Sequence, residues 1–278
     1  MARPVAATAR TSEAHRALTR LAFGFLWLPG GVLLLFILLP LLRMTFAQSW
    51  ESLRSVADMH SVRSAIWLSL QTAAATAFIA ALLGTPLAYF LARGSGWLKR
   101  LLEAVVDLPL AVPHTVVGIA LLFVFGRRGL LGALFAPLGL EFWGTKAGIV
   151  IAMLFVSVPF MVNSARLGFA AVDPRLEKVA RTLGASAFGV FYRVDLPLAW
   201  RGIMTGAVLT YARSISEIGA VMVLAYYPMT APVKIYDLYL QTGLSESSAA
   251  AVLLLLVTLS TFLLFRALID ANLGLNKR

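Results

Sequence analysis

The sequence predicts an all-α integral membrane protein with about six transmembrane helices. Three observations support this fold class. The chain is 60% hydrophobic and only 13% charged, its mean hydropathy is +0.84, and its apolar residues gather in six long stretches. Soluble domains average about 25% charged residues. A chain this apolar cannot cover itself with polar surface in water, so lipid is the solvent that its composition predicts.

Each stretch approaches the roughly 20 apolar residues that a helix needs to cross a bilayer. The expected spans cover residues 21–45, 64–92, 105–126, 147–166, 199–225 and 247–268. Together they form a single transmembrane domain over 21–270, between an N-terminal arm (1–20) and a C-terminal tail (271–278). The apolar piece Gly129–Leu140 contains a proline and three glycines, is too short to span, and predicts an interfacial or re-entrant segment.

The basic residues predict the orientation. With six spans both termini lie on one side, and 16 of the 24 lysines and arginines fall on that side, against seven on the other. Cytoplasmic loops of membrane proteins are enriched in Lys and Arg, so both termini are expected in the cytoplasm of a multi-pass protein of the cell (inner) membrane. The same bias explains the net charge of +11. No basic patch favours nucleic-acid binding.

The sequence lacks the motifs of several common catalytic and metal-binding sites. The chain has no cysteine, and its three histidines (15, 60 and 114) lack metal-ligand spacing. It contains neither a P-loop that would bind ATP nor a metalloprotease or hydrolase motif. We therefore expect no catalytic site, metal or cofactor in the chain itself.

The most informative segment lies between the fourth and fifth spans. Asp173 is a favourable N-cap, Pro174 fits the first helical position, and Gly184 suits the position just after a helix end. These capping and terminating residues predict a helix of about ten residues. Its apolar positions have the spacing of one helical face. They are Leu176, Val179, Ala180 and Leu183.

So short a helix is not stable alone, and its apolar face has to contact something. Two alternatives remain open at this point. The helix can lie on the membrane surface or its own bundle, or it can insert into the groove of a cytoplasmic partner.

The segment resembles the permease signature of binding-protein-dependent ABC importers, which reads Glu-Ala-Ala, three residues, Gly, nine residues, Ile, one residue, Leu-Pro. Lys178-Val179-Ala180 stands at the triplet, Gly184 at the glycine, Val194 at the isoleucine and Leu196-Pro197 at the end. Two residues depart from it. Lys178 replaces the signature acid, although Glu177 precedes it, and Val179 replaces the first alanine.

The resemblance implies a fold like that of type I ABC importer permeases, in which this loop forms coupling helices. It also implies two cytoplasmic ATPase subunits, which bind ATP and Mg, and an extracytoplasmic substrate-binding protein. The residues it assigns to ATPase coupling, within a loop over 173–197, are Asp173, Pro174, Leu176, Glu177, Lys178, Val179, Ala180, Leu183, Gly184, Ala185, Leu196 and Pro197.

Two further runs, Leu108–Ala120 and Ala212–Pro232, resemble permeases of the sulfate/molybdate/tungstate group, most closely its molybdate/tungstate members. This resemblance covers roughly residues 60–270 and implies import of an oxyanion. Alternatives are an ABC permease for sulfate or another solute, a secondary transporter or channel, and a membrane-embedded enzyme. A transporter would show inverted repeats and interrupted helices, and the sequence shows no clear repeat. Six spans are few for a two-sided pathway, so a homodimer is expected rather than a monomer, with a pair of different permeases as the alternative.

Arg213 lies about twelve residues past Arg201, which places it near mid-membrane, and Glu217 follows four residues later on the same helical face. Charged residues inside a membrane are costly and are functional candidates. One hypothesis is a structural ion pair; the other is that Arg213 lines the path of an anion. The candidates for the path and its gate are Arg213, Ser216, Glu217, Pro109, Pro113 and His114. The prolines predict either a flexible gate or a fixed kink.

Overall fold

A computed structural model describes residues 27–274, apart from the side chains of 270 and 272–274. Within this range the chain is helical and contains no strand. It divides into two units, Met1–Trp50 and Glu51–Arg278. The first unit contains a 20-residue apolar helix, Trp27–Phe46. The expected N-terminal arm lies outside the described residues.

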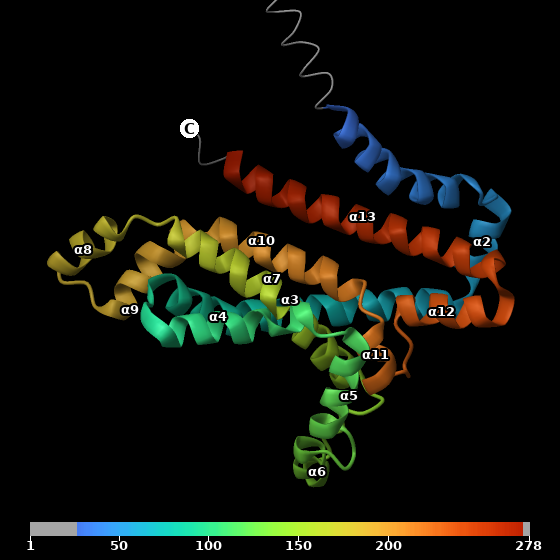
Figure 1. The fold of residues 1–278 in the computed structure, drawn as a ribbon, viewed down its shortest axis with the longest axis horizontal. Helices are drawn as coiled ribbons and strands as arrows, with labels where there is room; N and C mark the ends of the chain where they lie inside the picture. Colours follow the sequence, from blue (N-terminus) through green and yellow to red (C-terminus); the bar gives the residue numbers. More distant parts are fainter. Residues whose placement is uncertain (1–26, 275–278) are drawn as a thin grey trace, which may run out of the picture. The chain divides into compact units, whose positions relative to one another are not determined.

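The second unit contains the remaining helices (Figure 1). The long ones are α3 (His60–Arg93), α4 (Gly96–Ala111), α7 (Lys146–Ala170), α10 (Leu196–Ile215) and α13 (Leu244–Gly274). The shorter ones are α2 (Trp50–Asp58), α5 (His114–Phe125), α6 (Leu130–Phe135), η1 (Ala136–Leu138), α8 (Pro174–Thr182), α9 (Ala187–Val190), η2 (Phe191–Asp195), α11 (Gly219–Leu224) and α12 (Ala231–Thr242).

Helices α3, α7 and α10 pack side by side and form the centre of this unit (Figure 1). Their contact surfaces bury Met161, Val162, Ala165 and Phe169 of α7 against Ala199 and Ile203 of α10 and Ala80, Ala88 and Leu91 of α3. Helix α4 packs on α7, α11 packs on α5, and α12 packs on both α13 and α3.

The α7–α10 contact is a backbone contact. A Cβ atom added at Gly202 would lie 2.6 Å from the Gly168 Cα, and one added at Gly206 would lie 2.9 Å from the Met161 carbonyl oxygen. Small residues permit such an approach, and van der Waals packing of this kind holds membrane helices together where lipid removes the hydrophobic driving force.

Two of the expected spans are interrupted. The expected span 105–126 is divided between α4 and α5, because Val112 and Pro113 adopt extended backbone conformations where Pro113 cannot donate a helical hydrogen bond. The expected span 199–225 is divided between α10 and α11 at residues 216–218. Interrupted helices are what the transporter alternative also required, so this feature alone does not separate the two classes.

Within residues 27–274, five helical segments are long and apolar enough to cross a membrane. They are Trp27–Phe46, His60–Arg93, His114–Leu138, Lys146–Ala170 and Leu244–Ile269. The third joins α5 to the short α6 and η1, which form in the piece expected to be interfacial or re-entrant. Helix α10 is absent from this set despite its 20 residues. It contains Arg201 and Arg213 and is therefore less apolar.

We predict that Gly202→Ala separates α7 from α10, because the new methyl group meets backbone that cannot move aside. The expected loss is about 1–3 kcal/mol, measured as a lower Tm of the purified protein. The control is Gly31→Ala in the first helix, where an added Cβ meets no atom within 4 Å. Equal Tm values for the two variants would contradict the backbone contact.

Candidate functional site

The first candidate site is the signature segment, residues 173–197, which begins with α8. The Asp173 Oδ1 atom accepts the Arg175 backbone N–H at 2.9 Å, and Pro174 is the first helical residue. After the helix ends, Gly184 has a φ of +89°, which a residue with a Cβ adopts only under strain. The capped helix predicted from the sequence is therefore present with its expected boundaries.

The apolar face of α8 is open to solvent in the isolated chain. Leu176 is 47% exposed, Val179 56% and Leu183 83%, whereas Ala180 is half-buried. The helix thus does not dock its apolar face on its own bundle. Figure 1 shows α8 lying beyond the ends of α7 and α10.

The rest of the segment leads into α10. Ser186 caps α9 by accepting the Gly189 N–H at 3.1 Å. The rings of Phe188 and Tyr192 stack with centroids 6.3 Å apart, and both side chains are exposed. Leu196 and Pro197 then open α10, so the segment is continuous with the central bundle.

Arg93, the last residue of α3, joins this segment to the bundle. Its Nη2 atom lies 2.6 Å from Glu177 Oε1 on α8 and 3.3 Å from Asp195 Oδ1 in η2. It also donates to the Val172 carbonyl at 3.4 Å. The Asp195 side chain is fully buried. A buried carboxylate requires such a partner, so one guanidinium fixes both ends of the loop.

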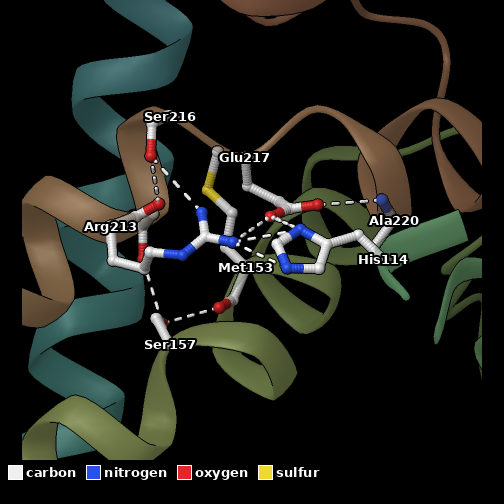
Figure 2. Close-up of polar contacts among 8 residues, drawn as sticks. His114, Met153, Ser157, Arg213, Ser216, Glu217 and Ala220 are labelled. Atoms are coloured by element: carbon white, nitrogen blue, oxygen red, sulfur yellow. Dashed lines mark hydrogen bonds and ion pairs between the residues drawn. The ribbon is translucent and has the colours of Figure 1, made fainter. Parts of the chain in front are cut away.

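The second candidate site lies at the break between α10 and α11 (Figure 2). Glu217 is 1% exposed, and its two carboxylate oxygens have separate partners. Oε1 accepts the Ala220 N–H at 2.9 Å, and Oε2 lies 3.0 Å from Arg213 Nη2 and 2.9 Å from His114 Nδ1. The side chain therefore satisfies an amide at the start of α11 that the interruption has left without a helical acceptor.

His114 connects this break to the other one. It is the first residue of α5, directly after Pro113. Arg213 Nη2 lies 3.0 Å from both ring nitrogens, and one N–H can serve only one of them. When Nδ1 donates to Glu217 Oε2, Nε2 is the nitrogen left to accept from Arg213 Nη2.

Two glycines bring the helices on either side close enough for these contacts. A Cβ added at Gly219 would lie 2.8 Å from the His114 Cβ, and one added at Gly118 would lie 2.6 Å from the Val223 Cβ. Helices α5 and α11 therefore pack almost without intervening side chains, which holds His114 beside Glu217.

Arg213 itself is partly exposed, with 22% of its side chain accessible. Its Nη1 atom donates to Ser216 Oγ at 3.3 Å, and Ser216 is exposed. The neighbouring Ser214 Oγ donates to Ser157 Oγ of α7 at 3.1 Å, and both serines are buried. The cluster thus presents one guanidinium edge and a hydroxyl to an open side, over a buried polar base.

The structure brings four of the six path candidates together: Arg213, Ser216, Glu217 and His114. Pro113 directly precedes His114, while Pro109 is buried within α4. The sequence analysis missed Arg93 and Asp195, which lie 102 positions apart. A fully buried aspartate next to the Leu-Pro pair has no local signal. Glu103 of α4 also pairs with Arg166 of α7, 2.6 Å apart.

The family model for the binding-protein-dependent transport system inner membrane component matches residues 84–273. A molybdate/tungstate transport system permease protein of Pyrococcus abyssi is 42% identical over 242 residues, which cover 86% of this chain and 92% of the relative. A molybdenum transport system permease protein of Mycobacterium tuberculosis is 37% identical over 240 residues, 85% of this chain and 90% of the relative. A probable sulfate transport system permease protein of Chlorella vulgaris is 34% identical over 227 residues, 80% and 85% of the two chains.

Solved structures share the fold. A chain of a bacterial alginate ABC transporter matches with a TM-score of 0.72 at 15% identity, covering 90% of this chain and 94% of its own. A chain of the MetNI methionine ABC transporter in an inward-facing conformation matches with a TM-score of 0.60 at 16% identity, covering 79% and 98%.

We predict that Arg93→Ala loosens the signature segment, because Asp195 stays buried without a cation. The expected destabilisation is about 1–3 kcal/mol, seen as a lower Tm and faster proteolysis between α7 and α10. The matched control is Arg100→Ala, since Arg100 is exposed on α4 and has no ion pair among residues 27–274. If Arg93→Ala melts like the control, the ion pairs do not hold the loop.

Proposed function

Because the chain belongs to the family of binding-protein-dependent transport system inner membrane components, we propose that it forms the membrane pathway of an ABC importer for molybdate or tungstate. The observation that carries this substrate is the 42% identity to a molybdate/tungstate permease over most of both chains. Sulfate is the second candidate, since a sulfate permease is 34% identical over 80% of the chain.

The signature segment is proposed to dock on a cytoplasmic ATPase subunit that binds ATP and Mg. Its support is the exposed apolar face of α8, which needs a partner, and the stiffness of the connection. Helix α10 begins at Leu196 and runs without a break to Ile215, a length of about 30 Å. A displacement of the segment would therefore reach the second site as a rigid-body movement.

Arg213 and Ser216 are proposed to line the anion path. A guanidinium recognises the oxygens of a tetrahedral oxyanion through its planar donors. Glu217 neutralises the charge of Arg213, which would weaken the attraction and let the anion leave. Glu217 itself is buried and its oxygens are occupied, which favours a positioning role for it rather than contact with the anion.

The remaining parts of the assembly follow from this proposal. A second copy of the chain would complete the pathway, two ATPase subunits would bind the two signature segments, and an extracytoplasmic binding protein would deliver the anion. Both termini would then lie in the cytoplasm, on the side of the signature segment.

The test is ATP hydrolysis in proteoliposomes that contain this chain and its ATPase. The binding protein is added with molybdate, tungstate, sulfate or no anion. We expect stimulation by the loaded binding protein, strongest with molybdate or tungstate. Strongest stimulation by sulfate would identify sulfate as the substrate instead. An ATPase that neither co-purifies with the chain nor responds to the binding protein would contradict the importer function.

We predict that Gly184→Val leaves the protein inserted but uncouples it. A β-branched residue at a φ of +89° costs about 1–2 kcal/mol, and the end of α8 would shift. Stimulated ATPase activity should fall several-fold, while Ala187→Val, an equally β-branched change at an exposed helical position of the same loop, retains it. Normal stimulation in Gly184→Val would count against coupling through α8.

We predict that Arg213→Ala lowers molybdate uptake about tenfold or more, with ATPase docking unchanged. Arg201→Ala on the same helix is the control, because Arg201 has no ion pair in the described part of the chain. Arg213→Lys, which keeps the charge, should recover part of the uptake. A folded Arg213→Ala protein that transports normally would rule out the path role.

A further inference from the structure

We infer that α8 fits an apolar cleft with an acidic rim on the ATPase subunit. This inference rests on the proposed function and adds the charge of the partner surface. The signature segment contains three acids and four bases. The acids and the bases differ in exposure and in whether they form ion pairs.

None of the three acids presents an exposed and unpaired carboxylate at the middle of α8, where a partner would dock. Glu177 pairs with Arg93 at 2.6 Å and is 14% exposed. Asp195 is fully buried. Asp173 is exposed, but one of its oxygens accepts the Arg175 N–H and caps the helix. Glu177, one position before Lys178, therefore cannot supply an outward negative charge.

All four bases are exposed: Arg175, Lys178, Arg181 and Arg193. None of them forms an ion pair with a residue that the structure describes. On the α8 cylinder, Arg175 and Lys178 follow one another at the i, i+3 spacing beside the stripe of Leu176, Val179 and Leu183. The surface offered to a partner is thus an apolar stripe with a basic border.

A surface of this kind also suits an anionic membrane, and the geometry favours a soluble partner instead. Helices α3, α7 and α10 pack side by side as the centre of the bundle, and α8 projects past their ends (Figure 1). Leu183, at the far end of α8, is 83% exposed. An apolar stripe held beyond the bundle meets a protein surface, whose complementary charge is negative.

The test measures the Kd of the ATPase subunit for the permease in nanodiscs of neutral lipid, at several salt concentrations. Lys178→Glu should raise the Kd about three- to tenfold, and Arg175→Glu with Lys178→Glu should raise it at least about tenfold. Lys178→Gln should have a smaller effect, and the salt dependence should be shallower in each variant than in the wild type. Arg128→Glu is the control for net charge, because Arg128 is exposed in the turn before α6.

The outcomes are distinguishable. If the wild-type chain does not bind the ATPase at all, the proposed function fails. If it binds and the reversals leave the Kd and its salt dependence unchanged, or tighten binding, the acidic rim is refuted and the importer function stands. If the reversals act only in nanodiscs of anionic lipid, the basic border contacts the membrane, which also refutes the inference. A Tm equal to that of the wild type for each variant excludes unfolding as the cause.

Discussion

The close approach of α7 and α10 is the contact on which the rest of the structure depends. Gly168 and Gly202 bring the two backbones together where any side chain would separate them. These two helices are joined by the signature segment at one end, and α10 ends beside the Arg213 cluster at the other. The glycine contact between α7 and α10 therefore fixes the positions of both candidate sites.

Both sites pair buried carboxylates, but a cation is the shared partner at one site and a carboxylate at the other. At the signature segment, one cation serves two carboxylates, and the surplus positive charge of the loop faces outward. At the α10–α11 break, one carboxylate serves a guanidinium, an imidazole and a backbone amide, and is itself hidden. In each case the buried charge is paired, as burial demands, and the basic side chain is the more exposed partner of the ion pair.

Local rules of helix chemistry predicted α8 well, because Asp173, Pro174 and Gly184 act through backbone geometry within a few residues. Pro113 stands at the break between α4 and α5, although the sequence predicted a single span over 105–126, either flexible or kinked at its prolines. The break between α10 and α11 contains no proline, and the sequence predicted a continuous span there. Its cause is the side chain of Glu217, which accepts the Ala220 N–H, together with the glycine contact to His114. Pairing of Arg93 with Asp195 is equally non-local, so no periodicity or spacing could reveal it. The family resemblance supplied the fold and the substrate class, whereas composition alone reached only a membrane bundle.

The composition of α10 has a consequence for the biosynthesis of the protein. A single arginine at the centre of an inserted helix costs about 2.5–3.5 kcal/mol, and α10 contains two arginines while α3, α7 and α13 are apolar enough to cross alone. Helix α10 is stabilised in the membrane by its neighbours, through the glycine contact with α7 and the neutral ion pair of Arg213 and Glu217. During synthesis, α10 is therefore expected to be stable in lipid only after α7 is in place beside it, and the loop between them has to be complete before the two helices can pack.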